Sequence, residues 1–452
     1  MTRLDRLREL VRGAGSESAS SSGSVTAGRN GVEPDAEWVA QALGGSLEPS
    51  PEGAYVVVRR TYGKDSRHGR RAIREYPMPS QELLGVLGGQ SSGPSTVAET
   101  DSVVCLDLET TGLRGGAGTF AFVVGFGWFE QGAFRTHQFV LSQLSAERWM
   151  LQAAAEVVGG ATTLLTFNGK SFDAPVMETR WALHRLPSPL EALRHVDLLH
   201  PARRLWRSDE GRLASLERAV LGLRRVDDVP GAEVPGRYVA FLRSGDPRLL
   251  APIVEHNRLD LVSLGVLAGL ACQHVRDGAT AGTDPEQALG LGRIYERVGW
   301  HDATITCYRR AARTDGTPAT RAEALRRLAL HHRRGQRHVE AADAWQRLLE
   351  LPGLAVGLRQ EASVALAVYH EHRAGNLRTA QRFAEQALET EWHPRRRSAV
   401  EHRLRRLGRK IAARPAKCGS LLAAGLEGAM TPNGEPKTSF AAPPAAVSGW
   451  RR

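Results

Sequence analysis

Two carboxylates stand at the end of a short apolar stretch, in the run Leu106-Asp107-Leu108-Glu109. In an extended strand, residues two apart project to the same side, so the side chains of Asp107 and Glu109 point together. Like charges side by side in an apolar strand are unfavourable unless a cation neutralises them, and carboxylate oxygens favour Mg²⁺ or Mn²⁺. The pair therefore indicates a metal-binding strand end, although such pairs also occur on exposed strands.

A second polar group is the run Asn-Gly-Lys-Ser-Phe-Asp at residues 168–173. It places Asp173 in the first turn of an expected helix, where a carboxylate can also satisfy free backbone amides. The tripeptide Gly-Lys-Ser in this run resembles the end of a phosphate-binding loop, but Leu164 stands where the first Gly of such a loop is required. A nucleoside-triphosphate loop is therefore excluded.

A third group is the run Glu-His-Asn-Arg-Leu-Asp at residues 255–260. In a helix, the four-residue spacing stacks His256 over Asp260 on one face. This arrangement suits a metal-binding carboxylate with a neighbouring proton acceptor, and it equally suits an ordinary surface His-Asp pair.

The elements that must position these residues begin at residue 102, where short β-rich runs alternate with helical periods. Such alternation predicts an α/β domain. Strands are expected at 103–109, 121–128, 134–140, 162–167 and 195–198, and helices at 145–158, 172–184, 213–221 and 248–275. A hairpin through residues 130–132 should join the second and third strands.

In this order, the three polar groups resemble the exonuclease motifs of the DEDD superfamily. The stretches 166–173, 197–206, 227–233 and 256–260 resemble, more closely, the YprB-type ribonuclease-H-like proteins. The resemblance covers roughly residues 102–272. It implies a ribonuclease-H-like mixed sheet flanked by helices, in which four carboxylates converge on two divalent cations, Mg²⁺ or Mn²⁺. These carboxylates belong to Asp107, Glu109, Asp173 and Asp260.

The same resemblance implies roles for three further residues. His256 would accept the proton from the water that attacks a phosphodiester, and Asn168 and Lys170 would position the scissile nucleotide. Family members with a His base usually place it five residues before the last Asp, whereas His256 stands at the spacing that usually carries Tyr. Asp197, at another strand end, is left outside the metal set because it could equally cap a helix.

The region from 287 to 412 is almost wholly helical by pattern and repeats. Gly299, Gly335 and Gly375 are 36 and 40 residues apart, close to the tetratricopeptide (TPR) period of about 34. This spacing predicts three helical hairpins stacked as a short TPR-like solenoid, with a plain helical bundle as the alternative. The remaining divisions expected are a flexible N-terminal segment (1–37), a small appendage (38–100), the exonuclease domain (101–276) and a disordered tail (413–452).

The positive charge of the 452-residue chain is concentrated in the helical region. The formal net charge is +11, and residues 287–412 alone carry 24 basic and 13 acidic side chains. This excess favours a nucleic-acid partner, DNA or RNA, although the abundance of arginine could also reflect codon bias. A protein partner could bind the repeats.

The location is expected to be cytoplasmic. No apolar stretch is long enough to span a bilayer, the N-terminus lacks an apolar signal segment, and the four cysteines form no Cys-x-x-Cys pair.

These observations predict a metal-dependent nuclease, acting as a 3′–5′ exonuclease through two metal ions. The alternative is a non-catalytic nucleic-acid-binding or scaffold protein on the same fold. The four carboxylates favour the enzyme, because a pure binder has no need to concentrate negative charge against phosphates.

Overall fold

The computed structural model describes residues 35–90, 102–112, 118–206, 212–390 and 393–413. The expected flexible segment 1–37 and tail 413–452 lie almost wholly outside the described residues. The chain divides into two compact units, the first ending at Leu366 and the second beginning at Ala367. Each unit is described separately below.

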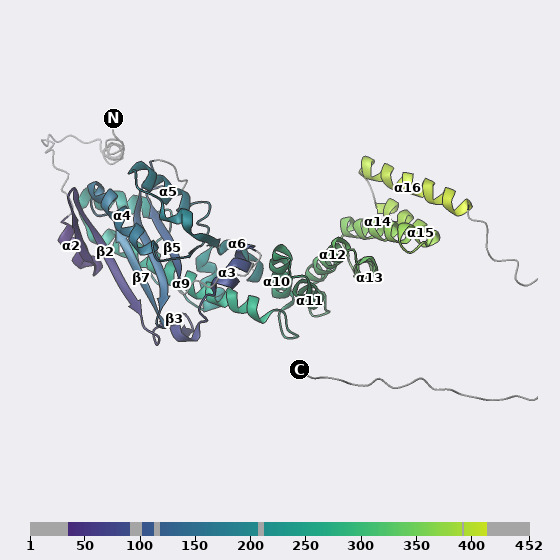
Figure 1. Ribbon diagram of the computed structural model, residues 1–452, viewed down its shortest axis with the longest axis horizontal. Coiled ribbons are helices and arrows are strands. Elements are labelled where there is room, and N and C mark those ends of the chain that lie inside the picture. Colours follow the sequence, from purple (N-terminus) through teal and green to yellow (C-terminus); the bar gives the residue numbers. More distant parts are fainter. Residues whose placement is uncertain (1–34, 91–101, 113–117, 207–211, 391–392, 414–452) are drawn as a thin grey trace, which may run out of the picture. The chain divides into compact units, whose positions relative to one another are not determined.

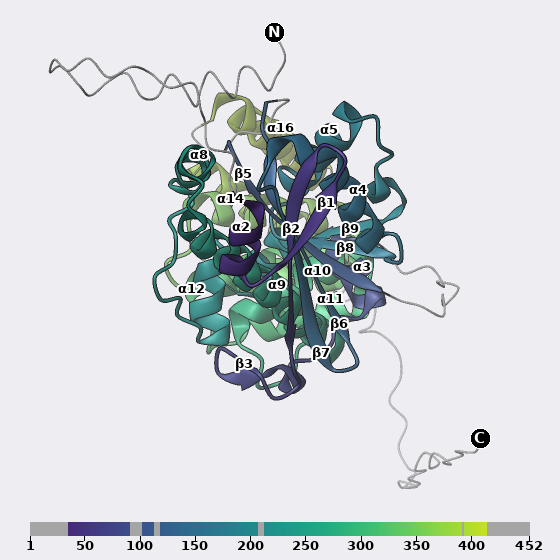
Figure 2. The same cartoon turned by 90° about the vertical axis from the view of Figure 1, so that its left-hand side faces the viewer.

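A mixed sheet of seven strands, in the order β1-β2-β7-β6-β5-β8-β9, organises the first unit (Figure 1). The strands are β1 (Ser46–Ser50), β2 (Gly53–Tyr62), β5 (Val103–Thr110), β6 (Ala121–Glu130), β7 (Ala133–Val140), β8 (Thr163–Thr166) and β9 (Arg194–Asp197). β5, β8 and β9 run parallel, and the other neighbours are antiparallel. The strands fan out across the view of Figure 2, as expected for a twisted sheet. The predicted mixed sheet is confirmed.

The hairpin between β6 and β7 turns through two residues with left-handed backbone. Gln131 has φ 51° and Gly132 has φ 79°, and the flanking residues Glu130 and Ala133 pair with each other. Two consecutive positive φ values are typical of the type I′ turn, whose twist matches that of the strands.

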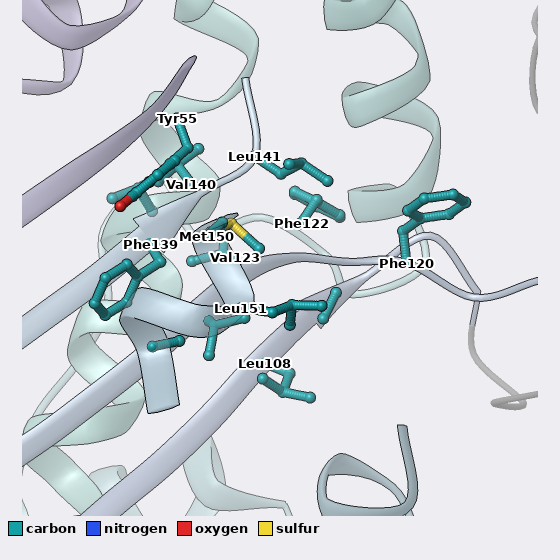
Figure 3. Packing of buried hydrophobic residues seen from close by; sticks show 14 of the residues in the cluster. Tyr55, Leu108, Phe120, Phe122, Val123, Phe139, Val140, Leu141, Met150 and Leu151 are labelled. Carbon is teal, nitrogen blue, oxygen red and sulfur yellow. The ribbon is translucent and has the colours of Figure 1, made fainter. Parts of the chain in front are cut away.

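Helices flank the sheet and enclose a hydrophobic core on each face. They are α2 (Ala36–Leu43), α3 (Gln81–Gly88), α4 (Glu147–Val158), α5 (Asp173–Leu183), α6 (Leu199–Leu205), α7 (Leu213–Leu216), α8 (Val234–Ser244) and α9 (Ala251–Asp277). Leu106 and Leu108 of β5 join one core, whereas Cys105 joins the other. Figure 3 shows Leu108 and Leu151 of α4 among the side chains of the first core. Asp107 and Glu109 therefore lie on the side of Cys105, as the two-residue period predicts.

The segment 38–100, expected as a small appendage, contributes β1 and β2 to the same sheet. β2 pairs with β7 from Val56↔Val140 to Tyr62↔Phe134. The segment also forms the short ribbon β3 (Arg67–His68) and β4 (Arg71–Ala72), followed by α3. Strand pairing between distant segments depends on tertiary contacts that a single sequence does not display.

The helical region begins in the first unit. It contains α10 (Pro285–Val298), α11 (His301–Ala311), α12 (Pro318–Arg334), α13 (His338–Leu349), α14 (Val356–His372), α15 (Leu377–Thr390) and α16 (Pro394–Ala412). Gly299, Gly335 and Gly375 lie in the turns within the three expected hairpins. The helical content is therefore as predicted, while the TPR-like character stays a prediction.

The first helical pairs lie in the same compact unit as the sheet, and the domain boundary expected near residues 276–287 stays a prediction. A Cβ on Gly290 of α10 would lie 1.8 Å from the backbone oxygen of Arg204 in α6. The absence of a side chain at this position lets α10 pack directly on α6, which is why the first helical pairs belong with the sheet. None of the described helices combines the length and apolar character needed to cross a membrane.

Candidate active site

The candidate site lies where β5, β8 and β9 end. Because the three strands are parallel, their carboxyl ends meet at one edge of the sheet. Asp107 stands opposite Gly125 of β6, and the register shifts between Glu109 and Thr110. This irregularity occurs at a candidate metal ligand, and such shifts re-aim side chains near functional sites.

Asp173 is the first residue of α5 and reaches back to β5. Its side chain is buried, and the backbone of Leu108, which lies between Asp107 and Glu109, acts to lower the pKa of its carboxyl group. The pKa of Asp173 is raised to about 7, chiefly by burial. The charges of Asp197 and Asp260 also raise this pKa, whereas backbone hydrogen bonds lower it. The carboxyl group is therefore held close to the other acidic groups.

Asp107 and Glu109 share this electrostatic environment. Burial raises the pKa of both carboxyl groups well above its usual range, and the nearby charges of Asp260 and Asp173 raise it further. A hydrogen bond from Asn257 partly offsets the effect at Asp107. The structure thus brings the four predicted carboxylates into one cluster, in which the negative charges repel one another.

Arg225 contacts two members of the predicted site, Asp260 and His256. The guanidinium group forms an ion pair with Asp260, bonds Glu217 at 2.6 and 2.7 Å, and lies 3.2 Å from His256 Nδ1. His256 Nδ1 is 2.6 Å from Asp228 Oδ1, and its Nε2 is 3.7 Å from Asp260 Oδ2. The sequence analysis did not identify Arg225, because charged residues on both sides of it gave the stretch the pattern of a solvated surface run.

A buried polar chain links Arg225 to the N-terminal segment. Ser263 donates a hydrogen bond to Glu217, and His68 of β3 lies 2.8 Å from the Ser263 hydroxyl. Burial, together with the charge of Arg225, lowers the pKa of His68 to about 4, so its imidazole is neutral near pH 7. The position of Arg225 therefore depends on hydrogen bonds that involve residues outside the three motifs.

Asn257, next to His256, is another residue that the sequence analysis did not assign. Its Nδ2 donates to Asp107 Oδ2 at 2.7 Å and to the Asp107 carbonyl at 3.0 Å. Its Oδ1 accepts from Gln138 Nε2 at 2.8 Å. The sequence offered one sign of this role, which is that an amide side chain stands inside the third motif.

The predicted nucleotide-positioning residues lie in the turn between β8 and α5. Asn168 and Lys170 are exposed, and Asn168 has φ 67°. The Asp197 carboxylate accepts from the backbone amides of Asn168, Lys170 and Leu199 at 2.8, 3.1 and 3.0 Å. Asp197 therefore fixes the turn and the start of α6, while the side chains of Asn168 and Lys170 remain accessible.

The chemistry of this cluster fits a divalent cation, because hard carboxylate oxygens are crowded together and mutually repulsive. Within the described ranges, however, no three Asp, Glu, His or Cys side chains are arranged to hold an ion as they stand. Asp260 is engaged by Arg225 instead. The donor set is suitable for a metal, and its side chains would have to rearrange to enclose one.

Comparison with known proteins defines the class. A model of the RNase_H superfamily matches residues 104–272, from β5 to α9. The strands β5 to β9 and the acidic edge thus belong to a ribonuclease-H-like domain, which indicates a nuclease-type activity and a nucleic-acid partner.

A curated relative defines the family. Over 346 residues the chain is 30% identical to "Uncharacterized protein YprB" of Bacillus subtilis (strain 168), covering 75% of this chain and 81% of the relative. The chain belongs to this YprB family.

Proposed function

We propose that this protein is a metal-dependent nuclease that hydrolyses phosphodiester bonds of DNA or RNA, acting as a 3′–5′ exonuclease. The observation that carries the proposal is the convergence of four carboxylates at the edge of a ribonuclease-H-like sheet, where burial and mutual repulsion raise the pKa of Asp107, Glu109 and Asp173. Such a concentration of negative charge hinders the binding of phosphates unless cations neutralise it.

The proposed metal ligands are Asp107, Glu109, Asp173 and Asp260, which would hold two Mg²⁺ or Mn²⁺ ions. When bound, such ions activate water and stabilise the charge that develops on a phosphodiester. The exposed side chains of Asn168 and Lys170 would contact the nucleotide at the scissile bond.

His256 is the proposed proton acceptor. The 2.6 Å contact from Asp228 is shorter than the 3.2 Å contact from Arg225, and it favours a proton on Nδ1. Nε2 is then the ring nitrogen that can accept a proton. Asp228 would be a positioning residue, since it orients the ring without reaching the substrate.

Digestion of end-labelled oligonucleotides with Mg²⁺ or Mn²⁺ tests the proposal. Asp107→Asn should slow cleavage about 100-fold or more, equivalent to losing about 2.7 kcal/mol of transition-state stabilisation. Glu178→Gln removes an exposed carboxylate from the same helix as Asp173 and should leave the rate unchanged. Cleavage that survives Asp107→Asn would refute the assignment, and labelling each end in turn reveals the polarity.

The ion pair between Arg225 and Asp260 favours a second candidate, a protein that binds nucleic acid without cutting it, with the helical repeats recruiting partners. In that case Arg225 is the permanent counter-ion of the acidic edge. Calorimetric titration with Mn²⁺ separates the two candidates. The nuclease should bind the ion and lose this binding in Asp107→Asn, whereas the non-catalytic protein should bind none.

A further inference from the structure

A second charged cluster lies away from the acidic edge, where α6 packs on α10 (Figure 1). Gly290 of α10 touches the backbone of Arg204, the next-to-last residue of α6. Arg293 and Arg297 follow Gly290 at spacings of three and seven residues, which places both on the same face of α10. Three arginines are thus gathered around one close helix contact.

Arg327 of α12 completes this arginine cluster, defined as Arg204, Arg293, Arg297 and Arg327. Burial lowers the pKa of Arg204, and the charges of Arg297, Arg293 and Arg327 lower it further. The positive charge of Arg204 is therefore repelled by the charges of the other three arginines. Like charges at such short range destabilise a fold unless an anion is present.

The carboxylates of the protein neutralise only part of this charge. Glu323 bonds Arg293 at 3.1 Å and Arg327 at 2.6 Å, and Glu296 bonds Arg327 at 3.2 Å. Glu323 also lies near Arg326, and Glu296 bonds Arg334 at 2.6 Å. The available negative charge is thus shared with arginines outside the cluster.

Two buried guanidinium nitrogens have no partner. Arg204 Nη1 and Arg293 Nε are both enclosed without a hydrogen-bond acceptor. Burying a cationic donor without an acceptor is costly, so two such donors within one arginine cluster call for an explanation. A bound anion supplies both the charge and the acceptor oxygens.

The surroundings favour one kind of anion. The guanidinium of Arg297 lies against Gly89, the C-cap residue of α3, where a Cβ would come within 2.1 Å of Arg297 Nε. Trp206, two residues after Arg204, is partly exposed and has its ring edge-to-face with His274. Arginines near a partly exposed aromatic residue are typical of sites that bind phosphates and stack bases of single strands.

We propose that the arginine cluster binds a backbone phosphate of a single-stranded nucleic acid at a site separate from the acidic edge. The choice of nucleic acid as the ligand rests on the proposed function. α6 begins directly after β9 and its residue Leu199 is capped by Asp197, so the cluster lies about one seven-residue helix, or roughly 10 Å, from the end of the sheet. A strand a few nucleotides long could reach both places.

Binding measured without cleavage tests this site. Fluorescence anisotropy of labelled single-stranded DNA and RNA oligonucleotides, in EDTA so that no cutting occurs, compares the full-length protein with Arg204→Gln and Arg297→Gln. Each substitution should weaken binding about 10-fold and reduce the salt slope by about 1, as expected for the loss of one phosphate contact. Arg248→Gln is the matched control, because Arg248 is 83% exposed and paired with Asp246.

Thermal unfolding separates a binding role from a structural one. Because removing one of four repelling charges relieves strain, Arg204→Gln should melt at the same or a higher temperature than the unsubstituted protein in phosphate-free buffer. Inorganic phosphate should stabilise the unsubstituted protein more than the variant. A variant that melts at a lower temperature and binds oligonucleotides normally would overturn the proposal. The proposal would also be overturned if the substitutions weakened the binding of polyglutamate but not that of oligonucleotides, which would point to an acidic protein partner.

The nuclease proposal fails independently of this one. Asp107→Asn should retain oligonucleotide binding through the arginine cluster even where all cleavage is lost. If no variant of the protein cleaves any polymer but Arg204→Gln still weakens binding, the arginine site stands and the nuclease does not. If cleavage depends on Asp107 while Arg204→Gln and Arg297→Gln bind oligonucleotides normally, the arginine site is refuted and the nuclease proposal stands.

Discussion

Asn257 joins α9 to the end of β5 by donating from one amide nitrogen to both the side chain and the main chain of Asp107, at 2.7 and 3.0 Å. Gln138 of β7 holds the other end of the amide through a 2.8 Å hydrogen bond. A fully buried amide thus fixes where the Asp107 carboxylate points. The third motif thus contains the residue that supports Asp107, because Asn257 lies between the predicted functional residues His256 and Asp260.

Replacing Asn257 with Ala should impair both stability and activity. Gln138 would lose one acceptor, Asp107 would lose its donor, and the free energy of unfolding should fall by about 1–3 kcal/mol. If the protein is a nuclease, kcat should fall more than KM rises, because the metal-binding carboxylate is no longer held. Urea unfolding and digestion kinetics measure the two effects, with exposed Gln273→Ala on the same helix as the control.

Gly125→Ala should disturb the packing of α9 on the sheet. A Cβ at this position would lie 2.2 Å from Asn257 Oδ1 and 2.9 Å from Leu261 Cδ1. Relieving these overlaps requires the side chains of Asn257 and Leu261 to shift at a cost of about 1–3 kcal/mol, and it moves the Asn257 amide away from Asp107. Gly160→Ala meets nothing within 4 Å and serves as the control. Equal stability of the two variants in urea would contradict the proposed close packing.

Local patterns were sufficient to predict much of this architecture. The two-residue period of a strand placed Asp107 and Glu109 on the face of Cys105, opposite Leu106 and Leu108, and the two cores show this division. The turn at Gln131 and Gly132 was likewise predicted, because Gly132 readily adopts a positive φ. Structural features that depend on a few neighbouring residues can be predicted from the sequence without knowing which residues pack against them.

Long-range partners could not be predicted in the same way. Arg225 meets Asp260 across 35 residues and Asn257 meets Asp107 across 150, and no local period marks either contact. The addition of β1 and β2 to the sheet is equally non-local. Such pairings are fixed by tertiary packing, so the sequence indicated the acidic residues but not the arginine and amide that restrain them.

Arg225→Gln should destabilise the protein and alter its response to metal. The Arg225 and Glu217 side chains are only 5% and 1% exposed, so the variant leaves buried carboxylates uncompensated, at a cost of about 3–5 kcal/mol. If the acidic edge binds cations, Mn²⁺ should raise the melting temperature of this variant more than that of the unsubstituted protein, because Asp260 is released. Exposed Arg224→Gln should behave like the unsubstituted protein. An equal Mn²⁺ shift in all three would argue against a metal site that includes Asp260.

In the second unit, the contact between α14 and α16 should weaken in acid. Glu371 accepts hydrogen bonds from Arg403, Arg406 and Lys410 at 2.6 to 2.9 Å. Burial alone would raise the pKa of Glu371, but the hydrogen bonds from Arg406 and Lys410 outweigh it and hold the pKa at about 2, below its ordinary 4.5. Since the folded-state pKa is the lower one, the stabilisation is complete above pH 4.5 and disappears as the pH falls towards 2.

Glu371→Gln should therefore reproduce the acid effect at neutral pH. Losing hydrogen bonds to charged groups should weaken the association of α16 by about 1.5–3 kcal/mol. Hydrogen–deuterium exchange of α16 amides, compared with the unsubstituted protein at the same pH, should be faster in the variant at pH 7, and the difference should shrink below pH 4.5. Exposed Glu389→Gln on α15 is the control. A difference that stays constant between pH 7 and pH 3 would mean that the ionised carboxylate does not hold the helix.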